Sequence, residues 1–185
     1  MVSSPCSNAE TVLRTYVHAK DENRPHLLAG VFTPDATLEV RNKSSAIAFP
    51  AVTAGRDAIA DVLVRNFAKS YENVYTFYMA RPHAGATDIA CDWLVCMTEK
   101  DSRSVRVGCG RYDWTLQVNP PGLASRLVIS IEAMQVLAPD QFEPVFAWVR
   151  SMDYPRASAD AAVRDAPQLP ALAPVLEYLA RGERS

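Results

Sequence analysis

The apolar residues change from helical to alternating spacing after residue 71, and that change limits the possible folds more than any other feature. In residues 9–21 and 56–71 they recur at the i, i+3, i+4 spacing of a helix with one buried face. Beyond residue 71 they alternate with a period of two, which is typical of strands that bury one face. The sequence therefore predicts mainly helices first and a sheet after them.

Shorter segments complete the pattern. A brief helix is predicted at residues 25–31, because a proline at the first helical position sacrifices no hydrogen bond. A half-buried strand is expected at residues 36–41, and residues 42–55 show no regular spacing. The remaining strands are predicted at residues 74–79, 88–98, 105–118 and 126–137. Helices followed by consecutive antiparallel strands are typical of the α+β class.

The last part of the chain differs in composition. Residues 139–185 hold six of the thirteen prolines and seven acidic against five basic residues, whereas acids and bases balance in the part before them. Apolar side chains at helical spacing in residues 142–149 and 172–179 predict two appended helices joined by a loose linker. We therefore expect an α+β domain at residues 1–138 and a helical extension at residues 139–185, which packs on the domain or on a partner.

Charge and hydropathy exclude several classes of protein. The chain has 19 Lys and Arg against 21 Asp and Glu, and this near balance argues against a nucleic-acid partner. Its 49% hydrophobic residues argue against disorder. No stretch approaches the roughly 18 apolar residues of a membrane helix. The first residues lack the basic and apolar regions of a signal peptide. We expect no membrane association and a cytoplasmic location.

The cysteines and glycines give no sign of a metal or cofactor. Cys6, Cys91, Cys96 and Cys109 form no Cys-x-x-Cys pair, and three of them lie in strand-like segments, where a free thiol acts as a small apolar side chain. Zinc binding or redox chemistry is the alternative reading of these thiols. No glycine-rich loop suits a phosphate group. We expect neither a metal nor a cofactor.

Four short motifs resemble, in their order and spacing, the SnoaL-like branch of the nuclear transport factor 2-like superfamily. They are Tyr16-x4-Asp21, Val31-Phe32-Thr33-Pro34-Asp35-Ala36, Gly55-Arg56-Asp57-Ala58-Ile59 and Gly110-Arg111-Tyr112. The resemblance covers residues 8–138. It implies a strongly curved antiparallel sheet wrapped around the N-terminal helices as a cone-shaped barrel of the cystatin-like type, here with extra C-terminal helices. It also implies an apolar pocket for a small apolar molecule. A homodimer is expected from the habit of the superfamily and from the apolar extension.

Asp21 is the candidate general base. The resemblance places it where several enzymes of the superfamily keep an acidic residue at the end of the first helix, facing the pocket. A carboxylate at an apolar mouth is poorly solvated, which favours its protonated form and suits it to proton abstraction. The alternative is a solvated residue in the polar run Lys20-Asp21-Glu22-Asn23.

The partner of such a base is less clear from the sequence. Dehydratases and dehydrochlorinases of the superfamily place a histidine on the strand after the third helix, and Phe77 stands nearest to that position here. No Asp–His pair is therefore carried over. Tyr16 is the candidate donor to a developing oxyanion, with core packing as its alternative. Arg111 is a candidate substrate clamp, and a cross-strand ion pair with Glu132 or Asp92 is its alternative.

Strand alternation supplies the candidate ligand-binding residues. In residues 105–118, Arg111 and Asp113 share one face, and aromatic residues occupy the other. A charged residue on an otherwise apolar stripe is either paired or functional. The candidate ligand contacts are Phe77, Tyr75, Trp93, Asp113 and Glu132.

Two functions are compatible with these residues. The first is a cofactor-free dehydratase, isomerase or cyclase that uses Asp21 as its base and acts on a small apolar, polyketide-like or steroid-like molecule. The second is a non-catalytic ligand-binding or scaffold domain. Asp21 and the internal charges favour the first, whereas the missing histidine favours the second.

Overall fold

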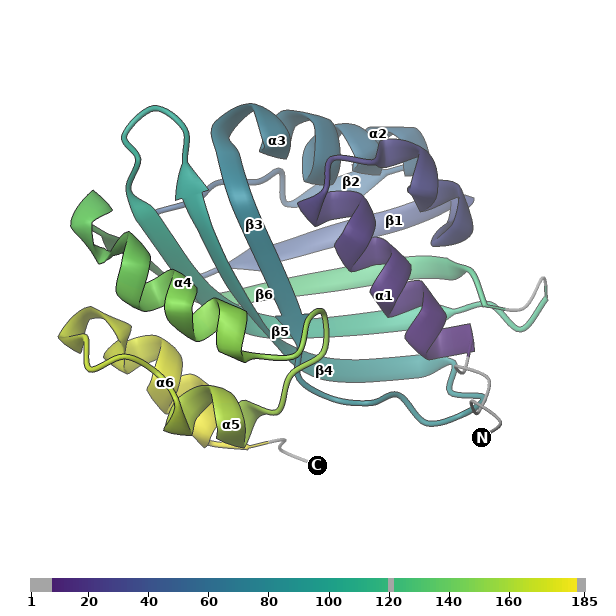
Figure 1. Ribbon diagram of the computed structural model, residues 1–185. Coiled ribbons are helices and arrows are strands. Elements are labelled where there is room, and N and C mark those ends of the chain that lie inside the picture. Colours follow the sequence, from purple (N-terminus) through teal and green to yellow (C-terminus); the bar gives the residue numbers. More distant parts are fainter. Residues whose placement is uncertain (1–7, 120–121, 183–185) are drawn as a thin grey trace.

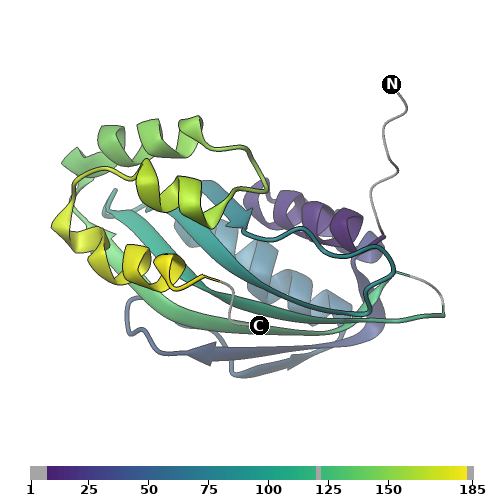
Figure 2. The same ribbon diagram turned by 90° about the horizontal axis from the view of Figure 1, so that it is seen from below.

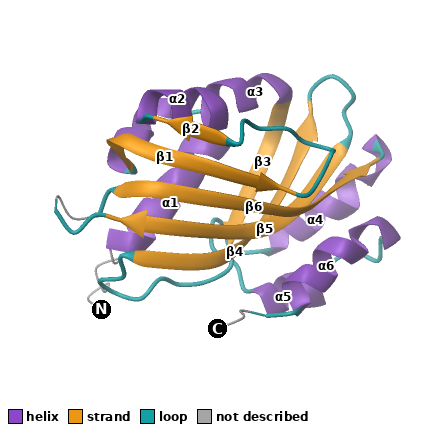
Figure 3. Cartoon of the chain, turned by 180° about the vertical axis from the view of Figure 1, so that it is seen from behind, coloured by secondary structure: helices purple, strands orange, loops and turns teal. Residues whose placement is uncertain are grey.

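The computed structural model describes residues 8–119 and 122–182. Within them, six strands form one curved, open sheet in the order β2-β1-β6-β5-β4-β3 (Figure 3). The strands are β1 Phe32–Asn42, β2 Val52–Ala54, β3 Tyr71–Tyr78, β4 Asp88–Glu99, β5 Val105–Leu116 and β6 Ala124–Leu137. The helices are α1 Asn8–Asp21, η1 Pro25–Gly30, α2 Arg56–Ala60, η2 Asp61–Arg65, α3 Asn66–Ser70, η3 Pro139–Gln141, α4 Phe142–Ser151, α5 Ala159–Arg164, η4 Pro170–Leu172 and α6 Ala173–Ala180.

The predicted α+β class and the curved sheet are confirmed, with three differences in detail. β1 and β6 pair in parallel, so the sheet is mixed rather than wholly antiparallel. The segment predicted to be irregular contains the short edge strand β2, which pairs with β1. The predicted helix at residues 56–71 is continuous but contains one π-helical turn, η2. Three-residue strands and single wide turns are too short to produce a periodic pattern in sequence.

Helices pack against both faces of the sheet, and a different set of helices packs against each face. In Figure 1, α1 lies on one side of β3, whereas α4, α5 and α6 lie on the other. The inner face packs against α1, η2 and α3 and contributes Trp93, Tyr112 and Trp114. The outer face packs against the C-terminal helices and contributes Leu94 and Val107, among others. Figure 2 shows these three helices against the teal strands and away from β1 and β2.

Helix α1 forms because one side of it is apolar. Val12, Leu13, Tyr16 and Val17 are each at most 3% exposed. Burying side chains of this size contributes roughly 1.5–3 kcal/mol each relative to leaving them in water. This packing holds α1 across the inner face of the sheet and places its last turn beside β3.

Gly110 accounts for part of the curvature. The register of β5 and β6 shifts between Cys109 and Gly110, where β6 carries an extra residue. A Cβ atom at Gly110 would lie 1.8 Å from the carbonyl oxygen of Ser130 and 2.8 Å from the ring of Trp93. Only glycine permits this approach of the two strands, because any side chain would collide with the backbone of β6.

The C-terminal segment packs on the same chain. Val145, Phe146, Leu172 and Val175 are fully buried or nearly so against the outer face of the sheet. The linker predicted to be loose contains α5, which is tied to α4 because the Trp148 indole nitrogen donates to the Ala162 carbonyl at 3.1 Å. The division into a domain at residues 1–138 and an extension stays a prediction.

The described cysteines are buried thiols. Cys91, Cys96 and Cys109 are at most 2% exposed. Burial raises the pKa of the Cys109 thiol to about 12. Cys6 lies outside the described residues. Within the described ranges no group of three His, Cys, Asp or Glu side chains gathers as a metal site. No helix among the same residues is long and apolar enough to cross a membrane.

Candidate functional site

An apolar cavity lies between α1, η2, α3 and the inner face of the sheet. Its volume is about 50 Å³, enough for one or two water molecules. The lining residues come from helices, strands and the loop between β1 and β2: Tyr16, Lys20, Val40, Ile47, Phe49, Leu63, Phe67, Thr76, Trp93, Val95, Met97, Tyr112, Ile129, Ile131 and Met134. The few polar atoms in this wall are the groups that can recognise a ligand.

Lys20 is the charged residue of the cavity wall. It is 7% exposed, although it belongs to the last turn of α1. Its ammonium donates to Asp21 Oδ1 at 2.8 Å and to Thr76 Oγ1 at 2.7 Å, and it lies 4.9 Å from the centre of the Phe67 ring. A buried cation needs such partners, because an unpaired one would be strongly disfavoured. Lys20 therefore presents a fixed positive charge beside an apolar space.

Asp21 lies behind Lys20 and does not line the cavity. Its side chain is 1% exposed. Besides Lys20, it accepts hydrogen bonds from the Thr76 backbone at 2.6 Å, the Thr76 hydroxyl at 2.9 Å and the Tyr154 hydroxyl at 3.0 Å. A carboxylate with this many donors is a strong anchor. The arrangement ties the end of α1 to β3 and fixes the position of Lys20.

Three aromatic side chains add polar atoms to the cavity. Among the described residues, the Trp93 indole nitrogen has no hydrogen-bond partner, whereas the Tyr16 hydroxyl interacts with the Tyr112 phenol. The ring of Tyr112 lies 5.7 Å from each of these two rings, measured between centroids. Burial raises the pKa of Tyr16 and of Tyr112 well above the usual value, so both phenols stay neutral donors. An orphaned buried donor costs about 1–3 kcal/mol, which a ligand oxygen would recover.

The sequence-predicted site residues separate onto the two faces of the sheet. Tyr16 and Trp93 line the cavity. Phe77 lies on the outer face, in the cluster formed with the C-terminal helices. Tyr75 is 36% exposed and contacts the rings of Phe146 and Tyr154.

The predicted charged residues also lie together on the outer face. Arg111 and Glu132 line a polar cleft beside α6 that also contains Asp92. Arg111 pairs with Asp113 at 3.1 Å, and both side chains are about 40% exposed. Glu132 pairs with Lys43 at 2.7 Å. These contacts are ion pairs on the surface of the protein, on the opposite side of the sheet from the cavity.

Lys20, Thr76 and Tyr154 are the site residues that sequence reasoning missed. Lys20 carried a usable signal, because it follows Tyr16 by four residues and therefore shares its helix face. Thr76 had a weaker signal. Its neighbours on β3 face outward, so strand alternation places the side chain of Thr76 on the inner face. Tyr154 had none, because it lies 133 residues after Asp21.

Comparison with known proteins agrees with the fold described above. The SnoaL-like domain family matches residues 8–122. A candidate isomerase from Rhodopseudomonas palustris is similar in structure, with a TM-score of 0.56 and 14% identity over 72% of this chain and 93% of that one. A protein of ketosteroid isomerase-like fold from Catenulispora acidiphila, in complex with trimethylamine, has a TM-score of 0.52 and 15% identity over 69% of this chain and 85% of that one.

A nuclear transport factor 2-like superfamily protein from Salmonella enterica gives a TM-score of 0.52 and 17% identity over 66% of this chain and 87% of that one. At such identities the likeness concerns the fold alone. No curated protein matches the chain by sequence. The family match spans more than half of the chain and the described fold agrees with it, so this protein belongs to the SnoaL-like domain family.

Proposed function

We propose that the cavity binds a small, mostly apolar molecule that carries a carbonyl-type oxygen, and that the protein catalyses a cofactor-free proton transfer on it as a lyase or isomerase. The observation that carries this proposal is that one apolar cavity is lined by the Lys20 ammonium, the Tyr16 phenol and the unpartnered indole nitrogen of Trp93. Donors of this kind stabilise negative charge as it develops on an oxygen, and they do so best where water is excluded.

The ligand would reach the cavity past two aromatic side chains. A cleft of about 230 Å³ adjoins the cavity and shares Ile47, Phe49 and Phe67 with it. The rings of Phe49 and Phe67 are stacked with centroids 6.4 Å apart. Pockets for small molecules usually measure roughly 300–1,000 Å³. A ligand would therefore occupy both spaces, after these two rings had moved apart.

Asp21 has two possible parts in the reaction. As the general base expected from the sequence, it would have to release the Thr76 hydroxyl and accept a proton from the carbon next to the ligand's carbonyl group. As a positioning residue, it would keep Lys20 at the cavity wall without meeting the ligand. The contacts described above favour positioning, and its role as base stays a prediction.

Non-catalytic ligand binding is the second candidate. It is favoured because the carboxylate of Asp21 is fully engaged and because the residues that line the cavity include no histidine. Such a protein would use Lys20, Tyr16 and Trp93 only to hold an oxygen of its ligand.

Proton NMR in deuterated buffer distinguishes the two candidates. A panel of small cyclic ketones and enones would be followed for exchange of the hydrogens next to the carbonyl group, and saturation transfer would report binding in the same samples. We expect at least one compound to bind and to exchange faster with the protein than in buffer, and we expect Lys20→Met to abolish the acceleration. Lys69→Met, which removes an exposed lysine of α3, is the matched control. Binding without exchange supports the second candidate, and no binding by any compound contradicts both.

A further inference from the structure

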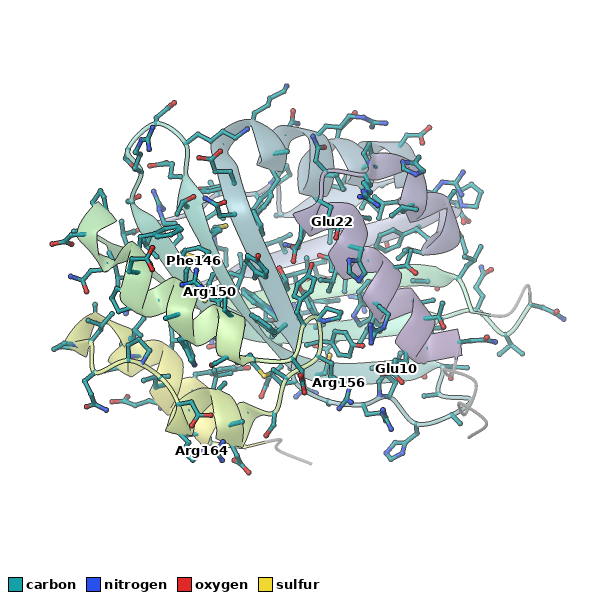
Figure 4. The ribbon with its side chains drawn as sticks, in the orientation of Figure 1. Glu10, Glu22, Phe146, Arg150, Arg156 and Arg164 are labelled. Atoms are coloured by element: carbon teal, nitrogen blue, oxygen red, sulfur yellow. The ribbon has the colours of Figure 1, made fainter. Side chains whose placement is uncertain are left out.

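The linker between α4 and α5 runs along the free edge of the sheet. The backbone N–H of Tyr78, at the end of β3, donates to the Pro155 carbonyl at 3.0 Å, and the N–H of Ala157 donates to the Tyr78 carbonyl at 3.2 Å. The Arg156 side chain reaches α1, where its Nε lies 3.6 Å from Glu10 (Figure 4). The linker is therefore held to both β3 and α1.

This attachment places the side chain of Tyr154 between α1 and β3. Its ring makes edge-on contacts with His18, Tyr75 and Phe77, at centroid distances of 5.5, 5.3 and 5.8 Å. Its hydroxyl donates to Asp21 Oδ2 at 3.0 Å. Ring contacts on three sides leave the hydroxyl little freedom, so the hydrogen bond to Asp21 costs little further ordering.

Two hydrogen-bonded steps connect Tyr154 to the cavity. Tyr154 and the Thr76 backbone both bind Oδ2 of Asp21, whereas Lys20 and the Thr76 hydroxyl bind Oδ1. Rotation of the carboxylate would break all of these contacts together. Tyr154 does not line the cavity itself. Its influence on a ligand therefore passes through Asp21 to Lys20 and Thr76, which do line the cavity.

We propose that Tyr154 is a positioning residue of the site and that the C-terminal segment, which lies beyond the residues matched by the SnoaL-like family, completes the arrangement of Asp21 and Lys20. This proposal rests on the proposed function for its catalytic consequence, but not for the placement of Asp21. The C-terminal segment thus does more than cover the outer face of the sheet, because its linker between α4 and α5 carries a residue that belongs to the inner site.

The placement is tested by NMR on the full chain, without a ligand. In a ¹H–¹⁵N spectrum, the amide proton of Thr76 reports its hydrogen bond to Asp21. Tyr154→Phe removes one hydroxyl and keeps the ring, and we expect the Thr76 amide proton to move upfield and to exchange faster with solvent. Tyr178→Phe is the matched control, because it removes a hydroxyl of α6 that donates to Asp92 at 2.9 Å on the outer face.

An unchanged Thr76 amide in Tyr154→Phe overturns the proposal, and so does an equal shift in both variants.

A second, catalytic experiment uses the ketone exchange reaction described above. Tyr154→Phe is expected to lower kcat severalfold and to leave KM nearly unchanged, because the residue acts without touching the ligand. Equal loss in Tyr178→Phe, or a rise in KM alone, contradicts a positioning role. Should the wild-type protein show no exchange at all, the proposed function fails and the NMR arm still decides the placement.

Discussion

The backbone N–H of Thr76 donates to Oδ2 of Asp21 at 2.6 Å, while the Thr76 hydroxyl donates to Oδ1 at 2.9 Å. One residue of β3 thereby binds both oxygens of the last residue of α1. The cavity closes at this junction, because α1 and β3 supply adjacent parts of its wall through Lys20 and Thr76. The stability of this junction and the geometry of the site depend on the same few hydrogen bonds.

Asp21→Asn is expected to destabilise the fold more than Lys20→Met. Loss of the carboxylate leaves the Lys20 ammonium buried with Thr76 as its remaining bonded partner, and breaking a buried pair in this way costs about 3–5 kcal/mol. Loss of the ammonium leaves Asp21 with three neutral donors, and we expect a cost of about 1–3 kcal/mol. Urea unfolding curves of both variants measure the difference. Equal costs, or the reverse order, would show that Lys20 does not depend on Asp21.

Alkaline pH is expected to weaken the fold in part through Tyr154. Burial first, and then the negative charge of Asp21, raise the pKa of the Tyr154 phenol above its ordinary value of 10.0. Above pH 10 the unfolded chain therefore loses this proton while the folded chain keeps it, so the contribution to stability is complete below pH 10 and decreases above it. Thermal melts between pH 8 and about 11 should show a shallower decline for Tyr154→Phe than for the wild type. The variant is still expected to lose some stability at alkaline pH, because the pKa values of Tyr16 and Tyr112 are raised as well. Equal declines in melting temperature for the variant and the wild type would contradict the assignment to Tyr154.

Gly110→Ala should destabilise the sheet. The new methyl group would meet the Ser130 carbonyl of β6, which cannot move without disturbing the strand pairing, so we expect a loss of about 1–3 kcal/mol or more. Gly30→Ala is the control, since no atom lies within 4 Å of a Cβ placed there. Thermal melting of the two variants gives the comparison. A wild-type melting temperature for Gly110→Ala would mean that the strands separate more easily than the structure indicates.

Phe49→Ala is expected to open the path between the cavity and its outer cleft. Phe49 lines both spaces and stacks on Phe67, so its removal joins them. Stopped-flow fluorescence with 8-anilinonaphthalene-1-sulfonate, an apolar anion suited to Lys20, should show severalfold faster association. Phe142→Ala removes an aromatic residue that stacks on Phe146, on the side of the sheet covered by the C-terminal helices, and serves as the control. Unchanged or slower association in Phe49→Ala would place the entrance elsewhere.

The expected homodimer loses its main physical argument. The apolar sides of α4 and α6 are covered by the outer face of the same chain, so they do not require a partner. Large apolar residues exposed among the described positions are few: Val52, Tyr75, Val118 and Val136. The homodimer stays a prediction, and light scattering at concentrations up to about 100 µM, far above ordinary dissociation constants for stable dimers, distinguishes it from a monomer of 20.3 kDa. A dimer mass would show that another surface mediates association.

Local pattern alone predicted much of the fold. The change in the spacing of apolar residues identified the boundary between the N-terminal helices and the long strands. The spacing is informative because the residues on the buried face of a helix recur every three or four positions, whereas those on the buried face of a strand recur every two. Alternation also separated Arg111 and Asp113 from Tyr112 and Trp114 correctly. The family resemblance is confirmed by the match at residues 8–122.

The sequence by itself determined most of the helices, the long strands, their order and the family of the fold. The tertiary structure alone decided which face of the sheet encloses the cavity. Where the C-terminal helices cover the outer face, that face is as apolar and buried as the inner one, so alternation cannot tell them apart there. It also decided the roles of Lys20 and Asp21, which are adjacent in sequence but meet different surroundings at the end of α1. The hydrogen bond from Tyr154 to Asp21 joins residues 133 positions apart, and only the packing of the C-terminal helices on the sheet brings them together.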